Sequence, residues 1–117
     1  MSEELKERTK DYGVRITKLY QALPRSTDAQ TLGKQLLRSG TSVGAHYREA
    51  QFAKSDADFI SKIEGALQEL EESRYWLQII VETHIFGESK MGSLIQETKE
   101  LTAILVTIVK KVKARNL

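Results

Sequence analysis

The two histidines of the sequence, His46 and His84, are the first candidates for metal binding or acid–base chemistry. A di-iron site in a helical bundle needs two Glu-x-x-His pairs and two further glutamates. Here His46 precedes Glu49, which reverses that order, and the sequence contains no second pair of this kind. Glu82 and His84 are two residues apart, so a helix would point them to different sides. We therefore expect no bound metal and no cofactor.

Carboxylates are the second candidates for chemistry, because four glutamates lie close together in the third quarter of the chain: Glu64, Glu69, Glu71 and Glu72. Paired carboxylates can perform acid–base catalysis, but helical spacing makes these residues a charged face in contact with water. The sequence has neither of the glycine-rich phosphate-binding signatures G-x-x-x-x-G-K-[ST] and G-x-G-x-x-G. It also has no cysteine, which excludes a thiolate nucleophile. The sequence thus predicts that the protein is not an enzyme.

Charge is distributed unevenly along the chain, although the formal net charge is only +2. Residues 56–90 hold eight acidic and three basic residues, whereas residues 31–55 hold one acidic and four basic, and residues 91–117 two acidic and five basic. One interpretation is complementarity between helices or subunits. The other is a basic surface for RNA or DNA. The candidate nucleic-acid-binding residues are Lys110, Lys111, Lys113, Arg115, Arg38 and Arg48.

The elements that must position these residues are helices, because apolar residues recur every three or four positions in four successive stretches. The first stretch must end by Pro24, the second runs from about residue 28 to 53, the third ends near residue 85, and the fourth covers about residues 90–114. Four helices joined by short turns predict an all-α, up-and-down antiparallel four-helix bundle. We expect one domain over residues 1–117. The sequence has no apolar run long enough to span a membrane and no signal peptide, so we expect a cytoplasmic protein.

Three local signals refine the helices. Gly40 and Gly44 lie four residues apart in a stretch of poor helix propensity, where a break is an alternative. We prefer a continuous helix, with both glycines on one face where another backbone approaches closely. Ser55 followed by Asp58 resembles a capping box that begins the third helix, and Gly87 is expected to end it.

The third helix is apolar over more than one face, which predicts packing on two sides. Its excess apolar residues do not all fit the inner seam of one bundle, so we expect self-association. The candidate interface residues are Trp76, Ile80, Ile60 and Phe52.

The stretch from Gln35 to Ala50, QLLRSGTSVGAHYREA, resembles the hallmark of the bacterial four helix bundle protein family, which includes proteins encoded in intervening sequences of large-subunit ribosomal RNA genes. Residues 58–63 and 69–77 are similar to its second block, and the resemblance covers about residues 10–115. The family motif matches at Arg38, Ser39, Gly44 and Glu49, whereas His46 stands where asparagine is common. We interpret the matched residues as structural, with small residues at a close helix contact and Arg38 paired with Glu49.

The resemblance implies an up-and-down bundle that assembles into a homopentamer and has no established enzymatic activity. A distant relative of similar shape, the accessory protein of diversity-generating retroelements, implies binding of nucleic acid and of a partner protein. Our leading hypothesis is a non-catalytic homo-oligomer, a pentamer, that presents basic surface to RNA or DNA. The alternative is a scaffold that docks a partner protein without binding nucleic acid. A carrier of a small molecule or metal ranks last, because the apolar stripes contain almost no polar groups.

Overall fold

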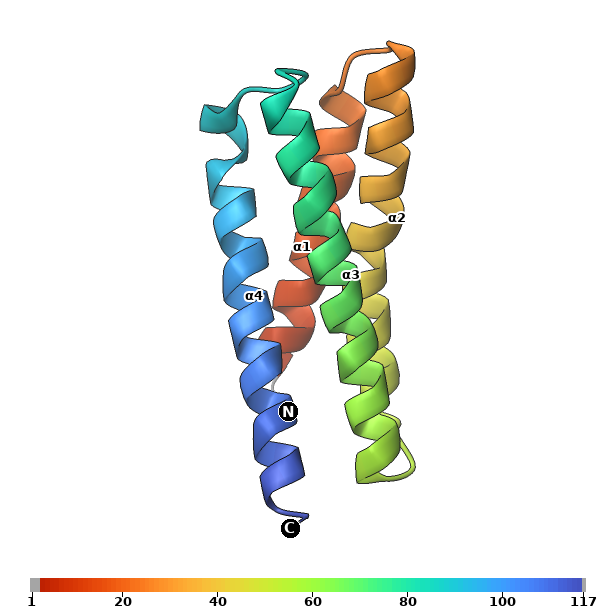
Figure 1. Cartoon of the computed structure of the whole chain (residues 1–117). Coiled ribbons are helices and arrows are strands. Elements are labelled where there is room, and N and C mark those ends of the chain that lie inside the picture. Colours follow the sequence, from red (N-terminus) through yellow and green to blue (C-terminus); the bar gives the residue numbers. More distant parts are fainter. Residues whose placement is uncertain (1–2, 117) are drawn as a thin grey trace.

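The computed structural model describes residues 3–116, except for the side chain of Lys90. Its four helices are α1 (Glu3–Ala22), α2 (Thr27–Ala50), α3 (Asp56–Glu82) and α4 (Glu88–Ala114). They run alternately up and down in a rod of 49 × 21 × 20 Å (Figure 1), and no strand occurs within residues 3–116. The predicted all-α, up-and-down bundle is therefore confirmed. Residues 1, 2 and 117 of the predicted single domain lie outside the described part.

The helix boundaries follow from local sequence. α1 ends at Ala22, two residues before Pro24, because a residue that precedes proline is disfavoured in the α region. The Ser55 hydroxyl accepts a hydrogen bond of 3.1 Å from the Asp58 amide, so the predicted cap of α3 is confirmed. α2 is continuous through its glycines, as expected.

The expected glycine stop of α3 is wrong. The residue in the left-handed conformation is His84, with a φ of 59°, whereas Gly87 has a φ of −73° and precedes α4. The Ile85 amide donates to the Ile80 carbonyl at 3.1 Å and the His84 amide donates to the Val81 carbonyl at 3.0 Å. This is the hydrogen-bond pattern of a Schellman motif, which usually places glycine at the position that His84 occupies.

The core lies along the bundle axis and is mostly apolar. Its largest fully buried side chains include Tyr12, Tyr47, Leu36, Ile63, Leu70, Leu77, Ile80 and Leu105. Only four polar side chains are buried in the described part of the chain: Thr9, Ser39, Ser73 and Thr98. Such groups must be hydrogen-bonded to avoid a large desolvation penalty. Ser39 and Ser73 meet this need at 2.8 Å between their hydroxyl oxygens, which joins α2 to α3.

The predicted close contact at the glycines of α2 is present. A Cβ atom built on Gly40 would lie 2.7 Å from Cγ1 of Ile16 in α1, and one on Gly44 would lie 3.3 Å from the Thr9 carbonyl oxygen. A Cβ atom built on Gly13 of α1 would lie 3.6 Å from the Cα atom of Thr41 in α2. The missing side chains therefore let the α1 and α2 backbones pack against each other.

Candidate functional site

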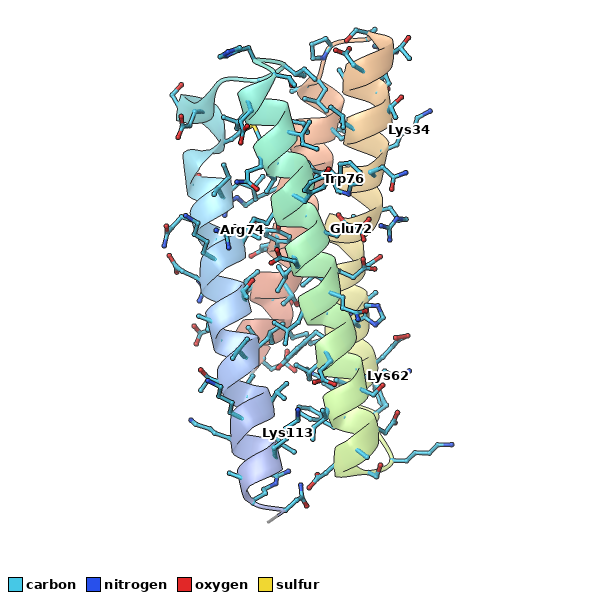
Figure 2. The ribbon with its side chains drawn as sticks, viewed as in Figure 1. Lys34, Lys62, Glu72, Arg74, Trp76 and Lys113 are labelled. Atoms are coloured by element: carbon cyan, nitrogen blue, oxygen red, sulfur yellow. The ribbon has the colours of Figure 1, made fainter. Side chains whose placement is uncertain are left out.

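Arg38 does not pair with Glu49, so that expectation is wrong. The two residues are eleven positions apart on one continuous helix, which separates them by about 16 Å along its axis. Arg38 instead reaches across to α3, where Nη1 lies 3.4 Å from Glu69 Oε1 and Nη2 donates to Glu72. Figure 2 shows Glu72 and Trp76 on the side of α3 that faces α2. The Trp76 indole donates to Glu72 at 3.3 Å.

His46 lies one step further along the same α2–α3 seam. Its Nδ1 is 3.7 Å from Glu49 Oε2 and its Nε2 is 3.9 Å from Glu69 Oε2. The ring covers Gly65, where a Cβ atom would come within 3.0 Å of Nδ1. Nδ1 is buried, and no hydrogen-bond partner for it occurs among residues 3–116. Ion pairs and the close contact between His46 and Gly65 therefore join α2 to α3 along this seam. Among its described residues, the seam holds no nucleophile with an adjacent base.

The Arg38 hydrogen bond lowers the pKa of Glu72 below its usual value of 4.5, with a smaller effect from the Trp76 indole. A lowered carboxylate pKa stabilises the folded state above pH 4.5, and this stabilisation is lost as the pH falls below that value. Arg38→Gln should therefore lower the free energy of unfolding by about 0.5–1 kcal/mol at neutral pH, as expected for a half-exposed ion pair. The difference from wild type should shrink as the pH is lowered from neutral to about 3.

Urea denaturation at the two pH values measures this effect. Arg25→Gln, in the exposed turn between α1 and α2, is the matched control because it removes the same charge without a contact to Glu72. A difference for Arg38→Gln that persists undiminished in acid would assign its role to packing of the arginine stem.

The remaining predicted basic residues fall into two groups. Lys110, Lys111, Lys113 and Arg115 are all exposed at the C-terminal end of α4, but two of them already have acidic partners on α3. Lys113 Nζ lies 3.5 Å from Glu64 and Arg115 Nη2 lies 3.1 Å from Asp56. The hydrogen bond from Arg115 lowers the pKa of Asp56. Lys110 and Lys111 have no ion-pair partner within residues 3–116.

This end of the bundle also holds a hollow of about 660 Å³ between the α2–α3 turn and the last turns of α4. Lys54 lines it together with Lys111 and Arg115, opposite Glu3 and Asp56. Phe52, in the same turn as Lys54, is 85% exposed. Lys54 was not among the predicted basic residues, because only the antiparallel arrangement brings it beside the α4 cations.

Arg48 lies apart from this hollow, on the outer side of α2, and lines a groove between α1 and α2 with Lys10 and Lys18. Arg38 belongs to the α2–α3 seam. The six predicted basic residues therefore do not form one surface. The structure brings four of them together and adds Lys54.

The four predicted interface residues also separate. Ile80 is completely buried in the core of its own chain, so it cannot contribute to a surface in this conformation. Trp76 and Ile60 are half-buried against the core, and Phe52 is the exposed member. The apolar breadth of α3 is used largely within the chain, since α3 packs against both α2 and α4.

Sequence reasoning missed the polar contacts between α1 and α4. Arg8 donates to both carboxylate oxygens of Glu97, at 2.8 and 2.7 Å, and to Glu100 at 2.8 Å. The hydrogen bond with Glu97 raises the pKa of Arg8. Alternating charges on the two helices were visible in the sequence, but the register that brings these three residues together was not.

The described residues contain neither a metal-binding cluster nor a membrane-spanning helix. Within residues 3–116, no cluster of three histidine, aspartate or glutamate side chains has the geometry to hold a metal ion. None of the helices in that range is both long and apolar enough to cross a lipid bilayer.

Comparison with known proteins gives two matches and one negative result. The model of the 23S rRNA-intervening sequence protein family matches residues 3–107. A solved structure of a protein from Bacteroides thetaiotaomicron, assigned to the S23 ribosomal protein family and of unknown function, is 38% identical in sequence with a TM-score of 0.86. The match covers 91% of this chain and 98% of that one. No curated protein matches the sequence significantly.

Proposed function

Because the chain belongs to the 23S rRNA-intervening sequence protein family, we propose that it is a non-catalytic, cytoplasmic homo-oligomer, a pentamer, that binds RNA or DNA through basic surface. The family match agrees with the resemblance recognised in the sequence. The observation that carries the binding proposal is the cationic end of the bundle, where the exposed Lys54 and Lys111 line a hollow and Lys110 is exposed next to Lys111.

The chemistry of this end suits a nucleic-acid backbone better than a base-specific site. Lysines neutralise phosphates and release counterions, which gives affinity that falls steeply with salt. Lys113 and Arg115 have acidic partners, so we assign the main contribution to the unpaired Lys54, Lys110 and Lys111. Phe52 is exposed in the same turn as Lys54, and an exposed aromatic ring can stack on an unpaired base.

Fluorescence anisotropy with a labelled single-stranded RNA, at low and at physiological salt, tests the proposal. The double variant Lys110→Glu/Lys111→Glu should weaken binding at least about tenfold at low salt and reduce the salt dependence, because two phosphate contacts are replaced by repulsion. The matched control is Arg25→Glu/Lys34→Glu, which changes the same charge near the other end of the bundle, where Figure 2 places Lys34.

Two results would count against the proposal. The first is absence of binding by the wild-type chain at low salt to both RNA and DNA. The second is equal weakening by the double variant and by its control, which would indicate a general charge effect without a site. The alternative scaffold function predicts no salt-dependent binding and a partner protein that copurifies with the chain.

A further inference from the structure

The outer side of the α1–α2 pair carries an apolar groove with basic residues along its edges. The groove has a volume of about 470 Å³ and a floor of small residues that includes Gly13, Gly44 and Ala45. It arises because the glycines bring the two helix backbones together, so that few side chains project over the contact. Val14, which lines it, is 43% exposed although it is apolar.

The groove is positively charged. Lys10, Lys18 and Arg48 line it, and no acidic side chain does. Lys10 is paired with Glu7 at 2.8 Å, whereas Lys18 and Arg48 have no ion-pair partner within residues 3–116. A long apolar groove with a cationic rim fits a helix that presents a protruding side chain flanked by acids.

The same chain offers such a helix on another face. The outward ridge of α3 consists of exposed residues at steps of four and three: Glu64, Gln68, Glu71, Tyr75, Gln78 and Glu82. The six ridge residues include three acids and no cation, and the exposed Arg74 lies beside them, three residues from Glu71. Tyr75 is 56% exposed and is held in place by an edge-on contact with the Trp76 ring, 5.0 Å between centroids. Glu64 already pairs with Lys113, which leaves Glu71 and Glu82 available.

We propose that the α3 ridge of one copy docks in the α1–α2 groove of the next, with Tyr75 over the small residues and Glu71 and Glu82 near Lys18 and Arg48. The groove follows α1 from Thr9 to Gln21, about 18 Å. The part of the ridge from Glu71 to Glu82 follows α3 for about 17 Å, so it fits within the groove. This inference rests on the proposed homo-oligomer and names its contact surfaces. Groove and ridge lie on different faces, so the contact is head-to-tail, the type that forms a ring when its rotation closes.

Substitutions at three exposed positions allow each half of the contact to be blocked separately. Ala45→Glu places a bulky acid on the groove floor, where it repels the acidic ridge. Glu71→Lys/Tyr75→Lys removes the protruding ring and places cations opposite the cationic rim. Ala103→Glu, an exposed alanine on α4, is the matched control. Circular dichroism of each variant verifies that the bundle remains folded.

Light scattering coupled to gel filtration measures the outcome. The wild-type chain and Ala103→Glu should form the same oligomer, whereas the groove variant and the ridge variant should each be monomeric. An equimolar mixture of these two variants should form a dimer and nothing larger, because only one intact groove and one intact ridge remain to pair.

Each other outcome has a defined meaning. A monomeric wild-type chain contradicts the proposed homo-oligomer and this inference with it. An oligomer of wild-type size from either blocked variant leaves the homo-oligomer intact and overturns only the groove and ridge. Two folded monomeric variants that do not pair when mixed also overturn it. Weakened RNA binding by Ala45→Glu with unchanged oligomer size would assign the groove to nucleic acid instead.

Discussion

Replacing Gly40 by valine should lower the free energy of unfolding by about 2–3 kcal/mol, the usual cost of forcing extra atoms into a close-packed contact. A Cβ atom at this position would lie 2.7 Å from Cγ1, 2.8 Å from Cγ2 and 3.0 Å from Cβ of Ile16. The last of these atoms is fixed to the α1 backbone, so a rotamer change cannot relieve the contact. The helices would have to separate, and the neighbouring contact at Gly44 would open with them.

Gly92→Ala supplies the comparison for this experiment. Gly92 lies in α4, is exposed, and has no atom within 4 Å of a Cβ built on it. Alanine there should raise stability by about 0.5–1 kcal/mol, because it removes only the intrinsic helix penalty of glycine. Urea denaturation of both variants separates the two effects. Ile16→Ala removes a buried core side chain, so the double variant Ile16→Ala/Gly40→Val should cost less than the sum of the two single changes. Unchanged stability for Gly40→Val alone would refute a close α1–α2 contact.

The fold was predictable because its determinants are local. Apolar periodicity defined four helices, Pro24 limited α1, and the Ser55–Asp58 pair began α3. Helix propensity alone would have broken α2 near Gly40, and the apolar phase correctly outweighed it because close packing against α1 compensates for the weak local preference.

The predictions that failed concern residues whose type does not indicate their burial or backbone conformation. Ser73 is polar, yet it lies fully buried in the core-facing stripe of α3, where it is hydrogen-bonded to Ser39. With Ser73 included, the stripe continues through Leu77 to Ile80, which puts Ile80 in the core and not at an interface. The end of α3 was also predicted wrongly, because the left-handed position that usually holds glycine is occupied by His84.

The candidate sites were less predictable, because they depend on the register between helices. The sequence showed that Arg38 and the α4 cations were present. Their partners Glu69, Glu72 and Asp56 all lie on α3, and the sequence could not show which cation each of them meets. Charge counts along the chain described the acidic α3 correctly. Much of its acidity, however, is satisfied by its own neighbours, and only the remaining charges are available to other molecules.

Thr98→Val should lower the free energy of unfolding by about 1–3 kcal/mol, the cost of a buried polar group that loses its partner. The Thr98 hydroxyl donates to the Leu94 carbonyl at 2.9 Å, so the Tyr12 hydroxyl must be the donor in the 2.7 Å bond between the two side chains. Valine keeps the shape of threonine but accepts no hydrogen bond. It therefore removes the 2.7 Å hydrogen bond of the completely buried Tyr12 hydroxyl between α1 and α4.

The double variant distinguishes this mechanism from a packing defect. Tyr12→Phe alone should cost about 1 kcal/mol, because it removes a donor whose partner Thr98 keeps its bond to Leu94. Tyr12→Phe/Thr98→Val removes both polar groups, so its total cost should be smaller than the sum of the two single changes. Chemical denaturation of the four proteins gives the coupling energy. Strictly additive losses would mean that the two hydroxyls do not interact.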